Sequence, residues 1–259
     1  MTRSDASFPS ENFKIAAHLY VPDTYQAHQK LPAVVVVNPF GGVKEQTAVS
    51  KPTFDRRYQG ASDGTPRQQE DPFGAAEDIK SAVTFLSLEE QVDPKRIGIL
   101  GICAGGGYVL FAAPMDHRIK AVATISGVDL GAFIRTIPKP TLDAERDHGP
   151  DPELMAEGAN YYLTPRGGHP SSINRTTVWS YDRMAIYDSF AQLDQISPRP
   201  VLLIAGSKAD TLLYSQKAFE LAKEPKELHI IDGSTHIDLY DRHAPQAYPK
   251  LTEFFKQKL

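Results

Sequence analysis

Short apolar runs and amphipathic stretches alternate along most of the chain. Runs of β-branched or apolar residues are typical of strands, and apolar residues three or four positions apart are typical of helices. The pattern predicts strands over Asn12–Tyr20, Ala33–Val37, 93–102, Ile119–Gly127, Pro200–Asp210 and Glu227–Asp232. It predicts helices over Gly74–Leu88, 105–113, Tyr214–Lys223 and Pro245–Lys258. The first of these strands alternates polar and apolar residues, which indicates an edge strand.

The order of these elements predicts an α/β fold. Strands that alternate with helices form βαβ units, and such units build a mainly parallel sheet with helices on both faces. The rhythm breaks between residues 130 and 197, which hold scattered prolines, short helical pieces and the only tryptophan, Trp179. We interpret 130–197 as a cap insertion between two parts of one core, 1–129 and 198–259.

Composition and charge limit the possible partners and the cellular location of the protein. The net charge of −4 offers no basic surface for nucleic acid or for an anionic membrane. The single cysteine excludes an internal disulfide framework, and no run approaches the roughly 18 apolar residues of a membrane span. The polar start lacks a secretory signal, so we expect an intracellular protein. The final residues Gln257, Lys258 and Leu259 partly match a peroxisomal address, which leaves cytoplasm or peroxisome open.

The sequence "GICAGGG" places that cysteine, Cys103, at a predicted strand-to-helix turn. Glycine two positions before and after a nucleophile permits a sharp turn that presents the side chain above the sheet. The N-terminus of the following helix favours a thiolate there, and the Ala104 N–H is placed to stabilise an oxyanion. The alternative is a small, inert core residue. The glycines do not match a dinucleotide fingerprint, no metal or phosphate-binding motif occurs, and we therefore expect no cofactor.

Two residues after later strands complete a possible catalytic triad. Asp210 and His236 follow predicted strands in the chain order nucleophile, acid, histidine that α/β-hydrolases use. His236 would accept the cysteine proton and Asp210 would orient the imidazole. Asp238 and Asp232 are rival acids. The second oxyanion donor is expected from the loop "NPFGG", where the N–H of Phe40 or Gly41 is suitably placed. His169, Tyr161 and Tyr162 are interpreted as structural residues, with a substrate contact as the alternative.

Several motifs together resemble one family. "NPFGGVKEQT", "YQGASDGTP", "VDPKRIGILGICAGGGY", "YYLTPRGGHP", "AGSKADTL" and "IDGSTHIDLYD" resemble the dienelactone-hydrolase-like α/β-hydrolases, and more narrowly the fungal polyketide transferase group. The resemblance covers nearly the whole chain. It implies an α/β-hydrolase fold with Cys103, Asp210 and His236 as catalytic residues, and a place in secondary metabolism or toxin biosynthesis.

The sequence departs from that family in two places. Dienelactone hydrolases carry a glutamate in the loop that corresponds to "NPFGG", and this loop has no acid. The segment Ala48–Arg57 is also too short for the usual helix and strand, since a βαβ crossover needs roughly 10–12 residues. We therefore expect a missing helix and a shortened or missing strand here, with apolar neighbours left uncovered beside the oxyanion loop.

The favoured function is acyl transfer through a cysteine acyl-enzyme. A small acyl substrate, free or bound to a carrier, would load Cys103, and a cap that excludes water would favour transfer to an alcohol or amine. Hydrolysis of an ester, lactone or thioester by the same residues is the first alternative. A degenerate, non-catalytic binding protein is the second, because of the shortened Ala48–Arg57 segment.

Overall fold

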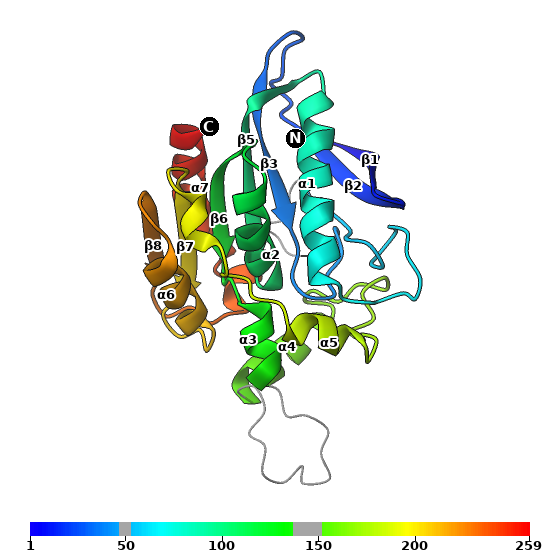
Figure 1. Cartoon of the computed structure of the whole chain (residues 1–259), viewed down its shortest axis with the longest axis vertical. Helices are drawn as coiled ribbons and strands as arrows, with labels where there is room; N and C mark the ends of the chain where they lie inside the picture. Colours follow the sequence, from blue (N-terminus) through cyan, green and yellow to red (C-terminus); the bar gives the residue numbers. More distant parts are fainter. Residues whose placement is uncertain (47–52, 137–151) are drawn as a thin grey trace.

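The described residues form one mixed sheet of eight strands with helices on both sides (Figure 1). A computed structural model describes residues 1–46, 53–136 and 152–259. The strands are β1 (Thr2–Ser10), β2 (Phe13–Val21), β3 (Leu31–Val37), β4 (Thr53–Phe54), β5 (Val92–Ile102), β6 (Ile119–Ile125), β7 (Val201–Gly206) and β8 (Lys226–Ile231). The α-helices are α1 (Pro72–Leu88), α2 (Ala104–Ala112), α3 (Leu130–Thr136), α4 (Pro152–Tyr162), α5 (Ser180–Ala185), α6 (Leu212–Leu221) and α7 (Ala244–Lys258).

The sheet is parallel except at one edge. Its strand order is β1-β2-β4-β3-β5-β6-β7-β8, and every pair from β4 to β8 is parallel. Strands β1 and β2 pair antiparallel with each other, and β2 pairs antiparallel with β4. The predicted α/β class and mainly parallel sheet are therefore confirmed.

The central strands separate two apolar cores because successive side chains point to opposite faces. In β3, Val35 and Val37 belong to the core beneath α1, α2 and α6, and Val36 belongs to the core covered by α7. Both cores are buried, which explains why these strands are apolar runs without polar alternation. Because the central strands are parallel, their carboxyl ends lie at one edge of the sheet, where β5 leads into α2.

The first strand was missed by sequence reasoning, and the predicted edge strand is not at the edge. Residues Thr2–Ser10 form β1, which pairs with β2 along its whole length. A turn at Glu11, with φ of 50°, connects the two strands. Only Phe8 and Ser10 of β1 are buried, so its sequence lacks an apolar run. Strand β2 consequently lies one position inside the sheet.

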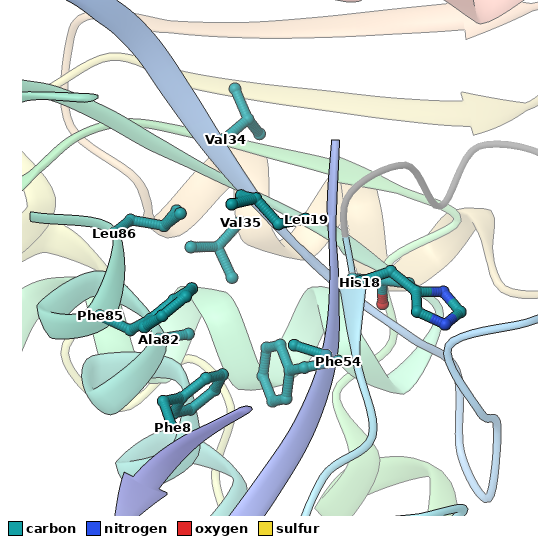
Figure 2. Close-up of a pocket in the computed structure, with 11 residues that line it drawn as sticks. Phe8, His18, Leu19, Val34, Val35, Phe54, Ala82, Phe85 and Leu86 are labelled. Atoms are coloured by element: carbon teal, nitrogen blue, oxygen red, sulfur yellow. The ribbon is translucent and has the colours of Figure 1, made fainter. Parts of the chain in front are cut away.

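The shortened strand is present, and its neighbours are largely covered. Strand β4 has two residues, so it joins β2 to β3 over a short distance only. Residues 48–52 of the predicted short segment lie outside the described residues. A cavity of about 30 Å³ lies beside β4, between β2, β3 and α1 (Figure 2). Phe8 and Phe54 meet edge to face at 5.8 Å over this cavity, and Phe8 stacks on Phe85. Phe8 from β1 therefore covers part of this apolar surface, and Leu19, Val34 and Phe85 stay partly exposed around the cavity, so the expectation of uncovered apolar neighbours holds in part.

Helices α3, α4 and α5 lie in the region predicted to form a cap. Figure 1 shows them beside the end of the sheet to which β3 points. This region contacts the loop after β3: Ser172 donates a hydrogen bond to the Gly41 carbonyl at 2.9 Å, and Gln46 donates one to the Gly167 carbonyl at 2.7 Å. No helix among the described residues has both the length and the apolar character to cross a bilayer.

Candidate active site

Cys103 occupies a strained turn between β5 and α2. Its φ of 56° and ψ of −123° are unfavourable for a residue with a side chain. A Cβ on Gly101 would lie 2.2 Å from the Gly105 carbonyl oxygen, and one on Gly105 would lie 2.3 Å from the Val37 carbonyl oxygen. Glycine is therefore required at both flanking positions. The turn leaves Cys103 partly exposed at the N-terminus of α2, as predicted.

Two backbone N–H groups point at the sulfur. The N–H groups of Ala104 and Phe40 both hydrogen-bond to Cys103. Gly41, the other candidate donor, instead donates its N–H to Glu70 at 3.3 Å. Ala104 and Phe40 thus form the pair that an oxyanion next to Cys103 would meet.

A buried ion pair holds the loop that carries Phe40. Arg56 donates hydrogen bonds to the carbonyls of Asn38 at 2.8 Å and Pro39 at 3.1 Å, and it pairs with Glu70 at 2.9 Å. Tyr108 of α2 donates to the same Glu70 oxygen, Oε1, at 2.5 Å. Sequence reasoning missed this arrangement. The acid that the loop lacks in its own sequence is supplied from the segment before α1.

The hydrogen bonds of His236 go to residues other than its predicted triad partners. Its Nε2 is hydrogen-bonded to the Tyr240 hydroxyl at 2.8 Å, and its Nδ1 is hydrogen-bonded to the Thr211 hydroxyl. Among the described residues, no hydrogen bond joins His236 to Cys103 or to Asp210. The structure therefore brings the predicted residues to the same edge of the sheet, where hydroxyl groups occupy both ring nitrogens of His236.

The three candidate acids differ in their surroundings. Asp238 accepts from the Thr235 N–H at 3.4 Å, and Asp232 accepts from the Ser207 hydroxyl at 2.9 Å. Asp210 precedes Thr211, and its Oδ2 is buried without a hydrogen-bond partner among the described residues. Asp210 is therefore the acid with an uncommitted oxygen beside the histidine's partner.

Tyr240 is the residue at this site that sequence reasoning missed. It ends the 3₁₀ helix η3 (Asp238–Tyr240), four residues after His236, and its ring packs at 5.4 Å from both His236 and Tyr161. Its hydroxyl is also a hydrogen-bond partner of Cys103 and of Tyr162. The spacing within "HIDLY" was the available signal, since residues four apart on a helical turn face each other.

Burial controls the protonation of both reactive groups. Burial raises the pKa of the Cys103 thiol, against the hydrogen bonds from Tyr240, Ala104 and Phe40, which favour the thiolate. Burial lowers the pKa of His236 to about 4, so the imidazole is neutral at pH 7. The helix N-terminus does not by itself give a resting thiolate, and deprotonation of Cys103 needs a base.

The pKa of His236 predicts an acid-sensitive fold. The unfolded chain binds a proton at its ordinary pKa of 6.5 and the folded protein only near 4. The stability that comes from keeping His236 neutral should therefore be fully present above pH 6.5. The free energy of unfolding should fall by about 3 kcal/mol as the pH drops from 6.5 to 4. Urea unfolding of the wild type and of His236→Gln between pH 4 and 7 measures the difference. Parallel curves for the two proteins would contradict this assignment.

His169, interpreted as structural, belongs to a turn. Its Nδ1 accepts a hydrogen bond from the Ser171 N–H at 3.2 Å, and the residue forms an isolated bridge with Ser172. Ser172 in turn contacts the loop that carries Phe40, through Gly41. These contacts favour a role in holding the loops together.

The chain is similar over nearly its whole length to two bacterial proteins, one of which has a crystal structure. The uncharacterized protein PA2218 of Pseudomonas aeruginosa is 34% identical over 95% of this chain and 77% of its own length. Its crystal structure superposes with a TM-score of 0.89 at 32% identity, covering 100% of this chain and 94% of that one. YcjY of Escherichia coli, also uncharacterized, is 31% identical over the full length of both chains.

Proteins with stated activities are more distant. The polyketide transferase ATR5 of Stachybotrys chlorohalonatus is 28% identical over 100% of this chain and 98% of its own. Est1E of Butyrivibrio proteoclasticus, solved with ferulic acid, shares the fold with a TM-score of 0.73 at 21% identity and covers 98% of each chain. The narrower resemblance to fungal polyketide transferases is thus weaker than the similarity to the two bacterial proteins.

The family assignment agrees with the fold. The model of the dienelactone hydrolase family matches residues 53–150, which include Cys103 and its turn. The mostly parallel sheet and its flanking helices are those of the α/β-hydrolase fold. The chain belongs to the dienelactone hydrolase family of the α/β-hydrolases.

Proposed function

We propose that this protein transfers acyl groups through a thioester formed on Cys103. The observation that carries the proposal is the meeting of three features at one sulfur: a strained turn that exposes it, two N–H donors aimed at it, and a buried neutral imidazole one hydroxyl group away. A nucleophile, an oxyanion site and a base are the parts that acyl transfer requires.

Each residue then has a defined role. The Cys103 sulfur attacks the acyl carbonyl carbon, and the carbonyl oxygen is stabilised by the N–H groups of Ala104 and Phe40. His236 receives the thiol proton and returns it to the leaving group. Asp210 is the proposed acid that stabilises the imidazolium, and its uncommitted Oδ2 and its neighbour Thr211 support that role.

Transfer is favoured over hydrolysis by the surroundings of the sulfur. Exchange between a donor thioester and an enzyme thioester is nearly isoenergetic, so loading is easy. The proposed cap, 130–197, supplies the rings of Tyr161 and Tyr162 next to Tyr240, and these apolar surfaces limit access of water to the acyl-enzyme. The full-length similarity to a polyketide transferase supports an acyl or polyketide substrate in secondary metabolism.

Hydrolysis by the same residues is the second candidate, because the family is named for a hydrolase. The two activities use the same acyl-enzyme and differ in the acceptor. An N-acetylcysteamine thioester of a short fatty acid, incubated with and without primary alcohols or amines, separates them.

Transfer predicts a conjugated ester or amide that increases with acceptor concentration. Free acid alone, at a rate independent of acceptor, would overturn transfer and leave hydrolysis. No turnover of thioesters, esters or lactones would favour the non-catalytic alternative, for which the two-residue β4 is the structural argument.

A further inference from the structure

The Tyr240 hydroxyl stands between the proposed nucleophile and its base. The hydroxyl lies 2.8 Å from His236 Nε2, and Cys103 packs against the same buried cluster that contains Tyr240 and Tyr161. Tyr240 is 1% exposed and His236 is 2% exposed, so no bulk water replaces this contact. Both ring nitrogens of His236 are engaged, one by Tyr240 and the other by Thr211.

The hydrogen bonds define where protons can move. When Nδ1 carries the proton and donates it to Thr211, Nε2 is an acceptor and the Tyr240 O–H donates to it. The oxygen of Tyr240 then has lone pairs free to accept the thiol S–H of Cys103. A continuous donor chain runs from sulfur to phenol oxygen to imidazole nitrogen.

We propose that Tyr240 is a catalytic residue that relays the proton from Cys103 to His236. The inference rests on the proposed function, in which Cys103 must lose a proton to attack. In the relay, the thiol proton passes to the Tyr240 oxygen while the phenol proton passes to His236 Nε2. The S–H and phenol O–H bonds break as a new O–H bond and an N–H bond form, giving thiolate, neutral tyrosine and imidazolium. Once the sulfur carries the acyl group, the imidazolium N–H proton passes to the Tyr240 oxygen while the phenol proton passes to the leaving group, which leaves neutral imidazole and neutral tyrosine.

The environment of Tyr240 keeps its phenol neutral throughout the relay. Burial raises the pKa of Tyr240 well above its usual range, and the neighbouring Cys103 and Tyr162 raise it further. The phenol therefore gives up its proton only as it receives another. Tyr162, on α4, is a further hydrogen-bond partner of the Tyr240 hydroxyl.

The test is a double-mutant cycle of Tyr240→Phe and His236→Ala. The rate at which iodoacetamide alkylates Cys103 at pH 7 is measured in the wild type, in both single variants and in the double variant. Phenylalanine keeps the ring and removes the relaying oxygen. Tyr240→Phe should slow labelling by about 100-fold, as expected for loss of positioned proton transfer. The same change made in His236→Ala should have little further effect, because both residues serve one transfer.

Tyr187→Phe is the matched control, since Tyr187 is equally buried and its hydroxyl has no hydrogen-bond partner among the described residues. It should label within about twofold of the wild type, because general acid–base catalysis is retained. If Cys103 were labelled at the wild-type rate in Tyr240→Phe but slowly in His236→Ala, the proton would pass directly from Cys103 to His236. That result would overturn the relay. Equal slowing by Tyr240→Phe in both backgrounds would also overturn it, because the hydroxyl would then act without His236.

The failure of the proposed function gives a different result. In that case wild-type Cys103 would label no faster than a free thiol, and neither substitution would change the rate. If Tyr240→Phe does not fold, the effect of Tyr162→Phe decides: slowing of about tenfold that disappears in His236→Ala supports the relay, given the usual size of such proton-transfer effects. An unchanged rate opposes it.

Discussion

Replacing Cys103 with alanine is expected to lower kcat for a thioester substrate by at least about 1,000-fold. The substitution removes the only atom on which the proposed acyl-enzyme can form, and the N–H groups of Ala104 and Phe40 remain to give a small residual rate. Steady-state release of the donor thiol, measured with a chromogenic thiol reagent, reports the loss. The fold should survive because Cys103 is partly exposed and its turn depends on the flanking glycines.

Met115→Ala is the matched control for loss of a sulfur atom. Met115 is 44% exposed and lies after α2, away from the turn that holds Cys103. Its activity should equal that of the wild type. If Cys103→Ala retained more than a tenth of wild-type activity, covalent catalysis at this position would be excluded.

Replacing Glu70 with alanine is expected to lower the free energy of unfolding by about 3–5 kcal/mol. Glu70 is 1% exposed and neutralises Arg56, which is 2% exposed, so the substitution leaves a buried cation without its partner. Urea unfolding at pH 7 measures the change. The kcat should fall as well, because Arg56 and Glu70 together position the loop that carries the Phe40 N–H.

Glu11→Ala is the matched control, because it removes an acid from the neighbouring arginine at the surface. Glu11 is 56% exposed and pairs with Arg57 at 2.6 Å, while Asp78 keeps Arg57 neutralised inside. The cost should be at most about 1 kcal/mol, as for surface ion pairs. Equal effects of the two substitutions would contradict the structural role assigned to Glu70.

The parts of the fold that the sequence predicted are those in which burial is written into a local pattern. Strands β3, β5 and β7 are buried on both faces, so their apolar runs were recognisable, and the turn at Cys103 is specified by glycines two positions away. Strand β1 was missed because it is stabilised by pairing with β2 and buries little of its own side-chain surface.

The candidate site was predicted at the level of residue types but not of contacts. Cys103, His236 and Phe40 came from spacing and chain order. The acid of the oxyanion loop, Glu70, and the hydroxyl between sulfur and imidazole, Tyr240, depend on which loops meet after folding. The contact of Glu70 joins segments that are distant in sequence, and no local pattern encodes it. The spacing within "HIDLY" indicates the contact of Tyr240 with His236 but not the position of its hydroxyl beside Cys103.

The shortened β4 bears on activity through the loop beside it. The oxyanion loop nevertheless keeps its anchors, because Arg56 follows β4 directly and binds the carbonyls of Asn38 and Pro39. This contact is the structural reason to expect a working oxyanion site despite the short strand.

The most direct measurement is the intact mass of the protein after brief incubation with an acyl thioester and quenching in acid. We expect a mass increase equal to the acyl group, mapped by peptide analysis to Cys103 and lost when an alcohol acceptor is added before the quench. Turnover of the thioester with no adduct, or with the adduct on another residue, would contradict it.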